Sequence, residues 1–200
     1  DDLIGRIGSG KTTIGRILTR LYLPAAGEEV VDGIDIRQYH PAELRAAVSS
    51  AGQTGDLFSG TVKENLMMAR PDATDAEIIA AAKASGVDEF VSRHPRGYDM
   101  NVGERGNNLS GGQKQAVAIA RLLLGKPKVV FLDEPSGSMD LASERVLIKQ
   151  LSAAFEKDTT VIISTHRFSM LDLVDRLLVV DQGRVIADGP KAQVLAAMQK

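Results

Sequence analysis

The apolar residues of this chain alternate between short runs and helix-like spacings, a pattern typical of α/β domains. The clearest run, residues 129–132, reads Val-Val-Phe-Leu, and the acids Asp133 and Glu134 follow it directly. A second run at 161–163 leads into a Ser-Thr-His segment that ends at His166. Such short, partly β-branched runs predict buried parallel strands. Because ligands bind at the C-terminal ends of parallel strands, these polar residues are candidates for a site.

Six segments place their apolar residues three or four positions apart, which predicts amphipathic helices. These segments are residues 14–21, 41–48, 74–86, 110–124, 143–155 and 190–198. Thr74 and Glu77 have the spacing of a capping box at the start of the third helix, and Ser110 is a good N-cap for the fourth. The buried faces of these helices are expected to include Leu21, Ile79 and Val146.

Two other segments predict antiparallel hairpins. Residues 29–36 carry an Asp-Gly pair between two short apolar runs, which is typical of a tight hairpin turn. Residues 177–187 repeat this pattern and are expected to close one edge of the sheet. The segment 49–52, Ser-Ser-Ala-Gly, is expected to form only a weak strand, and the pattern from about residue 56 to residue 107 is mostly helical.

The residues after Ile4 fit the phosphate-loop pattern G-x-x-x-x-G-K-[ST]. They are Gly5, Arg6, Ile7, Gly8, Ser9, Gly10, Lys11 and Thr12, with Thr13 beside them. The glycines let successive backbone N–H groups point at phosphate oxygens, as at a helix N-terminus. Lys11 can place its charge on the β- and γ-phosphates, and the Thr12 hydroxyl can ligate Mg²⁺. An ordinary strand-to-helix turn would explain the glycines alone but not the complete pattern.

A phosphate loop in the same chain gives the strand-end acids a chemical role. Mg²⁺ keeps several of its waters, so a strand-end carboxylate usually reaches the ion through water, and Asp133 suits that position. Glu134 is then placed to orient or deprotonate an attacking water. A second helix begins at Ser110, Gly111 and Gly112, and a serine with two glycines at a helix N-terminus is a second potential anion site. Plain helix capping is the alternative interpretation of that segment.

Composition excludes several classes of protein. The 200 residues, 44% of them hydrophobic, suffice for one domain with a real core. A net charge of −2 and a pI near 6.0 argue against nucleic acid or an anionic membrane surface as a partner. The sequence has no cysteine, which excludes a disulfide framework and thiolate metal sites. No apolar run reaches the roughly 20 residues that a membrane-spanning helix needs.

Four motifs together resemble the nucleotide-binding domain of ATP-binding cassette (ABC) proteins. They are the phosphate loop, Leu109-Ser110-Gly111-Gly112-Gln113, Leu132-Asp133-Glu134 and Ser164-Thr165-His166. The resemblance covers nearly all of residues 1–200. It implies a P-loop NTPase (RecA-like) α/β fold, with a mostly parallel sheet and an inserted α-helical subdomain at about 56–125. ABC domains carry an antiparallel β region before the phosphate loop, and this region is expected to be largely missing here.

The resemblance also implies roles in ATP hydrolysis. It makes ATP and Mg²⁺ the cofactors, with Thr12, Gln53 and Asp133 as the residues around the metal. Gln53 would also touch the attacking water. Glu134 would act on that water, and His166 would contact the γ-phosphate and hold this geometry. The residues implied to be catalytic are Glu134, His166, Gln53 and Lys11.

In the family, two cassettes pair head to tail. Ser110 and Gly112 of one cassette would then close on the γ-phosphate held by Lys11 of the other. The nucleotide-binding set implied by the resemblance consists of residues 5–13, Gln53, Ser110, Gly111, Gly112, Gln113 and Asp140. The partners are therefore expected to be a second cassette, in a homodimer, and a transmembrane domain that is either fused upstream or a separate subunit.

The implied function is an ATPase that powers an ABC exporter at the cytoplasmic face of the cell inner membrane. Residues 57–61, 97–99 and 102–106 are most similar to the ATPases of bacterial type I protein secretion. A soluble ABC ATPase acting on DNA or ribosomes is the alternative, but the chain has no room for the long coiled coil of chromosome and repair ATPases. A regulatory module without turnover would predict the loss of Glu134 or His166, and both are present.

Overall fold

The structure is a computed structural model that describes residues 2–4, 9–51, 57–137, 139–155 and 158–198. Its contacts divide the chain into two compact units. The first unit consists of Asp1–Ser50, Pro127–Pro135 and Asp158–Lys200, and the second consists of Ala51–Lys126 and Ser136–Lys157. The helical part predicted at about 56–125 falls in the second unit, which also contains the segment 136–157.

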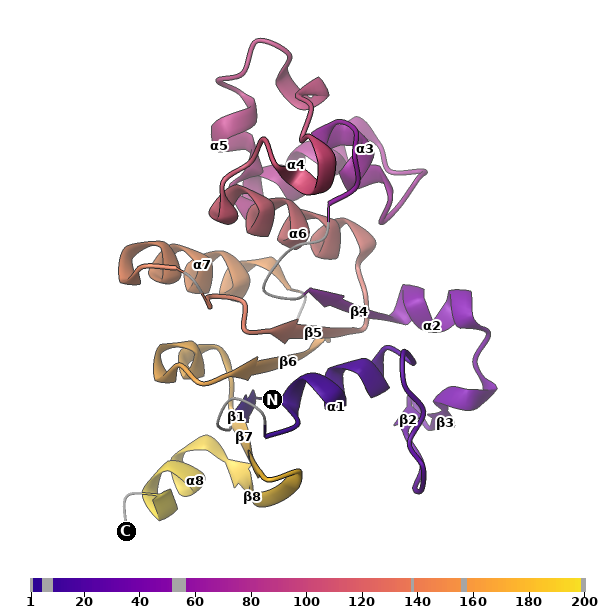
Figure 1. The fold of residues 1–200 in the computed structure, drawn as a ribbon, viewed down its shortest axis with the longest axis vertical. Helices are drawn as coiled ribbons and strands as arrows, with labels where there is room; N and C mark the ends of the chain where they lie inside the picture. The colour runs from indigo at the N-terminus through magenta and orange to yellow at the C-terminus, as the bar shows by residue number, and fades with distance from the viewer. Residues whose placement is uncertain (1, 5–8, 52–56, 138, 156–157, 199–200) are drawn as a thin grey trace. The chain divides into compact units, whose positions relative to one another are not determined.

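A six-stranded sheet within the described residues organises the first unit. Its spatial order is β4-β5-β6-β1-β7-β8 (Figure 1). The strands are β1 (Asp2–Ile4), β4 (Val48–Ala51), β5 (Val129–Asp133), β6 (Thr160–Thr165), β7 (Arg176–Asp181) and β8 (Arg184–Pro190). Neighbours from β5 to β7 run parallel, and β8 pairs antiparallel with β7, so the hairpin predicted at the sheet edge is confirmed. The segment expected to be a weak strand forms β4.

Helix α1 (Lys11–Leu18) packs on β5 of this sheet. Ile14 and Leu18 contact a small core that contains Phe131 and Val180. The helix ends before Leu21, which is 71% exposed, so the predicted extension of the helix to that residue is wrong. The helix stops because Arg20 adopts a left-handed conformation with a φ of 55°, and the preceding threonine hydroxyl bonds back into the last turn.

The segment between α1 and β4 contains the predicted hairpin. Strands β2 (Val30–Val31) and β3 (Ile34–Asp35) pair antiparallel around the Asp-Gly turn. The 3₁₀ helix η1 (Ile36–Gln38) and α2 (Pro41–Ala47) follow, the latter with its proline in the first turn. A local core of Val31, Ile36, Leu44 and Val48 joins these elements to the sheet.

Helices make up most of the second unit. They are α3 (Val62–Met67), α4 (Asp75–Ser85), α5 (Val87–Val91), α6 (Gly111–Gly125) and α7 (Leu141–Ala154), with the 3₁₀ helices η2 (Gly97–Asp99) and η3 (Glu104–Gly106). The capping box of Thr74 and Glu77 is confirmed at the start of α4. The core lies between α3, α4, α5 and α6, and Val62, Ala82 and Val117 are fully buried in it.

Three details of the predicted helical pattern are wrong. Ile79 is 38% exposed and Val146 is 54% exposed, because the buried faces of α4 and α7 lie about 100° to one side of these positions. On α7 that face contains Glu144, Leu147 and Leu151. Helix α7 also begins earlier than predicted. It starts at Leu141 and not at Ser143, because the Asp140 carboxylate caps it.

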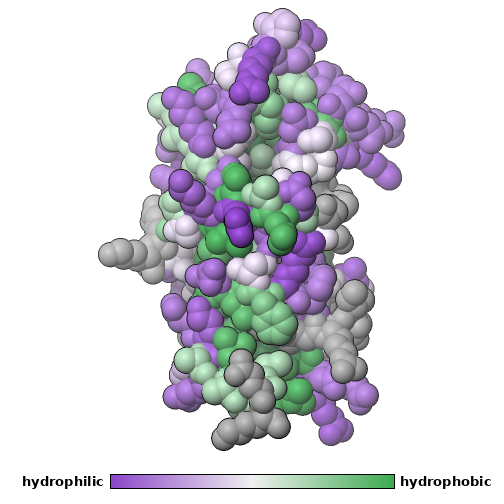
Figure 2. Space-filling view, turned by 90° about the vertical axis from the view of Figure 1, so that its left-hand side faces the viewer, coloured by the Kyte–Doolittle hydropathy of each residue, from purple (hydrophilic) through white to green (hydrophobic). Residues whose placement is uncertain are grey.

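The last part of the described chain returns to the first unit. After β6, the 3₁₀ helix η4 (Phe168–Leu173) leads into β7, and α8 (Lys191–Met198) follows β8. Val194 is buried against β8, while Met198 is 48% exposed. Hydrophilic side chains dominate the upper part of the face drawn in Figure 2, and hydrophobic ones gather lower on it. Within the described residues, no helix has the length and apolar character needed to cross a membrane.

Candidate nucleotide-binding site

The start of α1 is the first component of the site. Its N-cap is Gly10, which has a φ of 108° and offers no side-chain cap to the helix. The first turn contains no acidic residue, so nothing from the helix itself neutralises the positive end of its dipole. Lys11 is only 5% exposed, and the backbone oxygen of Ser9 accepts a 3.0 Å hydrogen bond from the Gly183 N–H. This helix start is therefore held in place, and its positive dipole end can face an anionic ligand.

The Thr12 hydroxyl and the Asp133 carboxylate are brought together as the sequence predicted. Thr12 Oγ1 donates a 2.8 Å hydrogen bond to Asp133 Oδ2, although the two residues are 121 positions apart in sequence. Asp133 is the last residue of β5, and α1 packs on that strand. A hydroxyl and a carboxylate at this distance suit an octahedral Mg²⁺ site that phosphate oxygens and waters complete. Within the described residues, no group of three or more acids or histidines forms a metal site without phosphate.

Glu134 and His166 form the second contact of the site. His166 Nδ1 lies 2.9 Å from Glu134 Oε1, so the imidazole can fix the orientation of the carboxylate. Glu134 has a φ of 47°, an uncommon value for a residue with a Cβ, and its N–H donates a 2.8 Å hydrogen bond to the backbone oxygen of Ser164. The register of the sheet places Asp133 opposite Ser164, which brings the two strand ends together.

Several buried oxygen atoms at these elements have no hydrogen-bond partner within the described residues. They are Ser9 Oγ, Asp133 Oδ1, Glu134 Oε2 and Ser164 Oγ. Buried polar atoms are normally paired, because leaving one unpaired costs free energy. Hydroxyl and carboxylate oxygens are also the atoms that bind Mg²⁺ and order water around a phosphate. The residues present therefore fit ATP with Mg²⁺.

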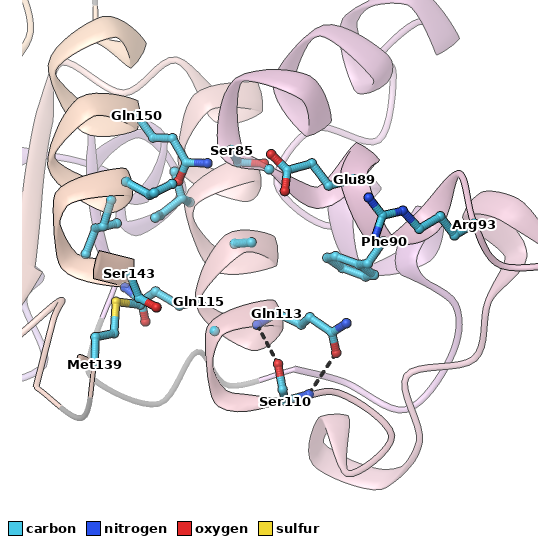
Figure 3. Close-up of a pocket in the computed structure, with 16 residues that line it drawn as sticks. Ser85, Glu89, Phe90, Arg93, Ser110, Gln113, Gln115, Met139, Ser143 and Gln150 are labelled. Atoms are coloured by element: carbon cyan, nitrogen blue, oxygen red, sulfur yellow. Dashed lines mark hydrogen bonds between the residues drawn. The ribbon is translucent and has the colours of Figure 1, made fainter. Parts of the chain in front are cut away.

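The second glycine-rich helix start lies in the other unit and is built differently. Ser110 is the N-cap of α6, and its hydroxyl accepts a 3.2 Å hydrogen bond from the Gln113 N–H. The Gln113 side chain returns a bond by accepting the Ser110 N–H at 2.9 Å, as the dashed lines in Figure 3 show. Ser110, Gly111 and Gly112 are exposed. The predicted N-cap is confirmed, and the segment is a complete capping box with a free outer surface.

The remaining predicted site residues have separate outcomes. Asp140 is the N-cap of α7, where the Ser143 N–H donates to its carboxylate at 2.8 Å. This backbone hydrogen bond holds the pKa of Asp140 below its usual value. Thr13 is exposed on the first turn of α1. Gln53 and residues 5–8 lie outside the described residues, so their predicted roles remain predictions.

Sequence reasoning missed two residues, one that positions α1 on the sheet and one that holds the segment before α3. Gly15 lies on α1 where a Cβ would meet the Phe131 ring, which allows the helix to lie close to β5. Asn65, 1% exposed, bonds the Phe58 N–H and the backbone oxygens of Phe58 and Thr61 at 2.9–3.0 Å. A glycine inside an otherwise helical pattern is the one signal that could have indicated the first of these contacts.

Comparison with known proteins identifies the family. The family model for the ABC transporter matches residues 2–137. Proteins of Staphylococcus aureus described as multidrug export ATP-binding/permease proteins are 38% identical in strain NCTC 8325 and 37% identical in strain RF122, over 96% of this chain. A bacterial Atm1-family ABC exporter solved with ATP bound is 39% identical over 98% of the chain, with a TM-score of 0.90.

The chain spans about a third of the length of these relatives, 33% of the curated proteins and 34% of the solved chain. The match confirms the predicted resemblance and the predicted α/β fold of P-loop NTPases. Domains of this kind bind ATP with Mg²⁺ and hydrolyse it, in agreement with the residues gathered around Thr12 and Asp133. The chain therefore belongs to the ABC transporter family.

Proposed function

We propose that this chain is the nucleotide-binding domain of an ABC exporter and that it hydrolyses ATP to drive transport. The observation that carries this proposal is the pair of contacts at the ends of β5 and β6, Thr12 with Asp133 and Glu134 with His166. The first contact suits a metal-bound triphosphate, and the second suits a water aligned for attack on it. The match to chains three times longer, described as exporters, supports the coupling to transport.

Each residue has a role in this proposal. Lys11 holds the β- and γ-phosphates, and Thr12 and Asp133 hold Mg²⁺, which neutralises phosphate charge when bound. Glu134 accepts a proton from the attacking water or orients it, and His166 positions that carboxylate. Gln53 is assigned to the same metal and water.

We also assign the exposed start of α6 to a second copy of the cassette. Ser110 and Gly112 would contact the γ-phosphate bound by the partner, with Gly111, Gln113 and Asp140 beside the same nucleotide. The exposure of the segment and the absence of acids from the first turn of α6 support this assignment, because an anion is favoured there. The pairing would be a head-to-tail homodimer at the cytoplasmic face of a membrane, beside a transmembrane domain.

The descriptions of the relatives bear on the class of transported substrate. The relatives described as multidrug exporters favour export of small molecules. The similarity of residues 57–61, 97–99 and 102–106 to type I secretion ATPases remains a prediction, and none of the relatives reported above carries that description. No relative reported above is described as a DNA or ribosome ATPase.

The proposal can be tested with Glu134→Gln, which keeps the size of the side chain and removes its basicity. Loss of a general base costs about 10²- to 10⁴-fold in rate, so ATP turnover should fall by that factor while binding of a fluorescent ATP analogue persists. Sedimentation velocity with ATP and Mg²⁺ should show a dimer of the variant. Glu43→Gln, which changes an exposed carboxylate of α2, is the matched control and should behave as the unsubstituted chain. Turnover that is unchanged in Glu134→Gln would remove this residue from the proposed role.

A further inference from the structure

The second unit contains a cavity of about 370 Å³, and all the residues that line it belong to this unit (Figure 3). Its walls come from α6, α7 and the α4–α5 junction. Ser110, Gly112 and Gln113 line its outer edge, at the start of α6. The inner part is lined by Ile119, which lies two turns further along the helix, about 10 Å beyond Gly112. The cavity therefore extends well past the segment assigned to the partner's nucleotide.

The inner wall is apolar and firmly packed. Ile119 is 1% exposed and Leu147 is 3% exposed, so both side chains are fixed by the surrounding helices. Val146 lies on the same wall and is 54% exposed, so it adds an accessible hydrophobic side chain to the lining. A cavity of this size with an apolar wall matches the lower range of small-molecule sites, about 300 to 1,000 Å³.

One buried polar group in the lining has no partner. Gln115 is only 3% exposed, and its Nε2 atom makes no hydrogen bond within the described residues. Gln115 lines the cavity together with Ser143 and Met139, and all three are labelled in Figure 3. Buried amide groups are almost always paired, so an unpaired Nε2 in a cavity wall marks a place for an acceptor oxygen.

The charged side chains of the rim have opposite signs. Glu89 and Arg93 both line the cavity, and both are exposed. Their charges cancel, so these two side chains give the part of the cavity beyond the α6 start no net charge. Phe90 lies between them in sequence and adds an aromatic ring to the lining. The rim thus favours an uncharged molecule with an aromatic body.

We propose that this cavity binds small uncharged aromatic molecules that carry a carbonyl or amide oxygen. The oxygen accepts the hydrogen bond of Gln115 Nε2, and the ring lies against Ile119, Val146 and Leu147. This site is additional to the nucleotide site, and its occupancy does not depend on ATP. Its walls include Gln113 of the α6 capping box, so a bound molecule contacts the segment that the proposed pairing uses.

The experiment compares two probes by methyl NMR on the 200-residue chain without nucleotide. Acetanilide supplies a ring and an amide oxygen, whereas ethylbenzene supplies the ring alone. Methyl signals of Ile119, Leu147 and Val146 should shift with millimolar acetanilide. In Gln115→Met, which keeps the volume and removes the donor, acetanilide should bind about fivefold more weakly, the effect of one hydrogen bond, while ethylbenzene binds at least as well as before.

A second variant tests the cavity without disturbing a buried residue. Val146→Phe changes an exposed wall position and should prevent both probes from shifting the Ile119 methyl signal. Lys149→Ala, an exposed position of α7 outside the lining, is the control and should leave both titrations unchanged. The proposal is overturned if neither probe shifts these methyl signals, if Gln115→Met weakens both probes equally, or if the shifts follow protein concentration instead of probe concentration. Lys11→Ala should bind acetanilide normally, so failure of the proposed ATP function would not mimic failure here.

Discussion

Helices α1 and α6 both begin at glycine-rich segments, but only one of the two starts has a side-chain cap. Gly10 gives α1 no side-chain cap, whereas Ser110 and Gln113 cap α6 with two reciprocal hydrogen bonds. Neither helix has an acidic residue in its first turn. A helix start with neither a side-chain cap nor an acid in its first turn favours an external anion, while a capping box satisfies two donors from within the chain. The comparison indicates that an anionic ligand would complete the start of α1, whereas the start of α6 is already capped.

The largest effect is expected from a substitution at the uncapped start of α1. Lys11→Ala removes a cation that is 5% exposed at the start of α1. A hydrogen bond to a charged group contributes about 1.5–3 kcal/mol, so ATP affinity should fall by about 10- to 100-fold. Equilibrium titration with a fluorescent ATP analogue measures this change. Lys149→Ala on the exposed face of α7 is the control, and equal affinity in the two variants would contradict the assignment of Lys11.

The next effect concerns how close α1 lies to its sheet. In Gly15→Ala the new Cβ would lie 2.6 Å from Phe131 ring carbons, and overpacking of this kind costs about 1–3 kcal/mol. This contact is closer than real Cβ atoms show, so the cost should lie in the upper part of that range, about 2–3 kcal/mol. Higher helix propensity of alanine returns about 1 kcal/mol, so a net loss of about 1–2 kcal/mol in unfolding free energy is expected. Urea unfolding measures it.

Two further variants make this prediction specific. Gly111→Ala on α6 meets no heavy atom within 4 Å, so it should not lower stability. Gly15→Ala should cost less in a Phe131→Leu background than in the unsubstituted chain, because the ring that the methyl group meets is gone, and the Phe131→Leu chain alone is the reference for this comparison. A Gly15→Ala chain as stable as the unsubstituted one would show that the helix can move away from β5 at no cost.

How far the sequence predicts this structure depends on whether a feature is local. Capping boxes and strand-end acids are local, and the predictions at Thr74, Ser110 and Asp133 match the structure. Periodicity marks a face only to within one residue, so Ile79 and Val146, at the margins of their helices, were predicted to be buried and are exposed.

Contacts between distant segments are not readable from one sequence. Spacing does not show that Asp133 lies opposite Ser164 or that Thr12 bonds to Asp133 across 121 positions. The phosphate-loop motif and the needs of Mg²⁺ supplied the expectation that Thr12 and Asp133 serve one site. The start of α7 was missed for a related reason. Asp140 and Ser143 are both good caps, and only the observed hydrogen bond shows which of them caps the helix.

A smaller effect is expected from a substitution in the capping box of α6. Ser110→Ala removes the acceptor of the Gln113 N–H and should lower the unfolding free energy by about 1 kcal/mol. Ser110→Asn retains a capping oxygen and should restore most of that loss. Urea unfolding measures both variants, and ATP affinity of the single chain should not change in either. If asparagine did not restore the lost stability, the Ser110 hydroxyl would stabilise the protein by an interaction other than helix capping.

The smallest effect is expected from the charge of a capping box, because the boxes of α6 and α4 use a neutral and an acidic residue respectively. The box of α6 uses the neutral Gln113, whereas the box of α4 uses Glu77, whose pKa is lowered to about 2, first by the Arg70 side chain and then by the Thr74 N–H. A carboxyl with a lowered folded-state pKa stabilises the protein above its usual pKa of 4.5, and the contribution disappears as the pH falls toward 2. In Glu77→Gln, stability should therefore be lower than in the unsubstituted chain at neutral pH, and the difference should vanish near pH 2.

Urea midpoints across this range measure the difference, with Glu89→Gln, an exposed carboxylate of α5, as the control. A constant difference at every pH would assign the role of Glu77 to its shape instead of its charge.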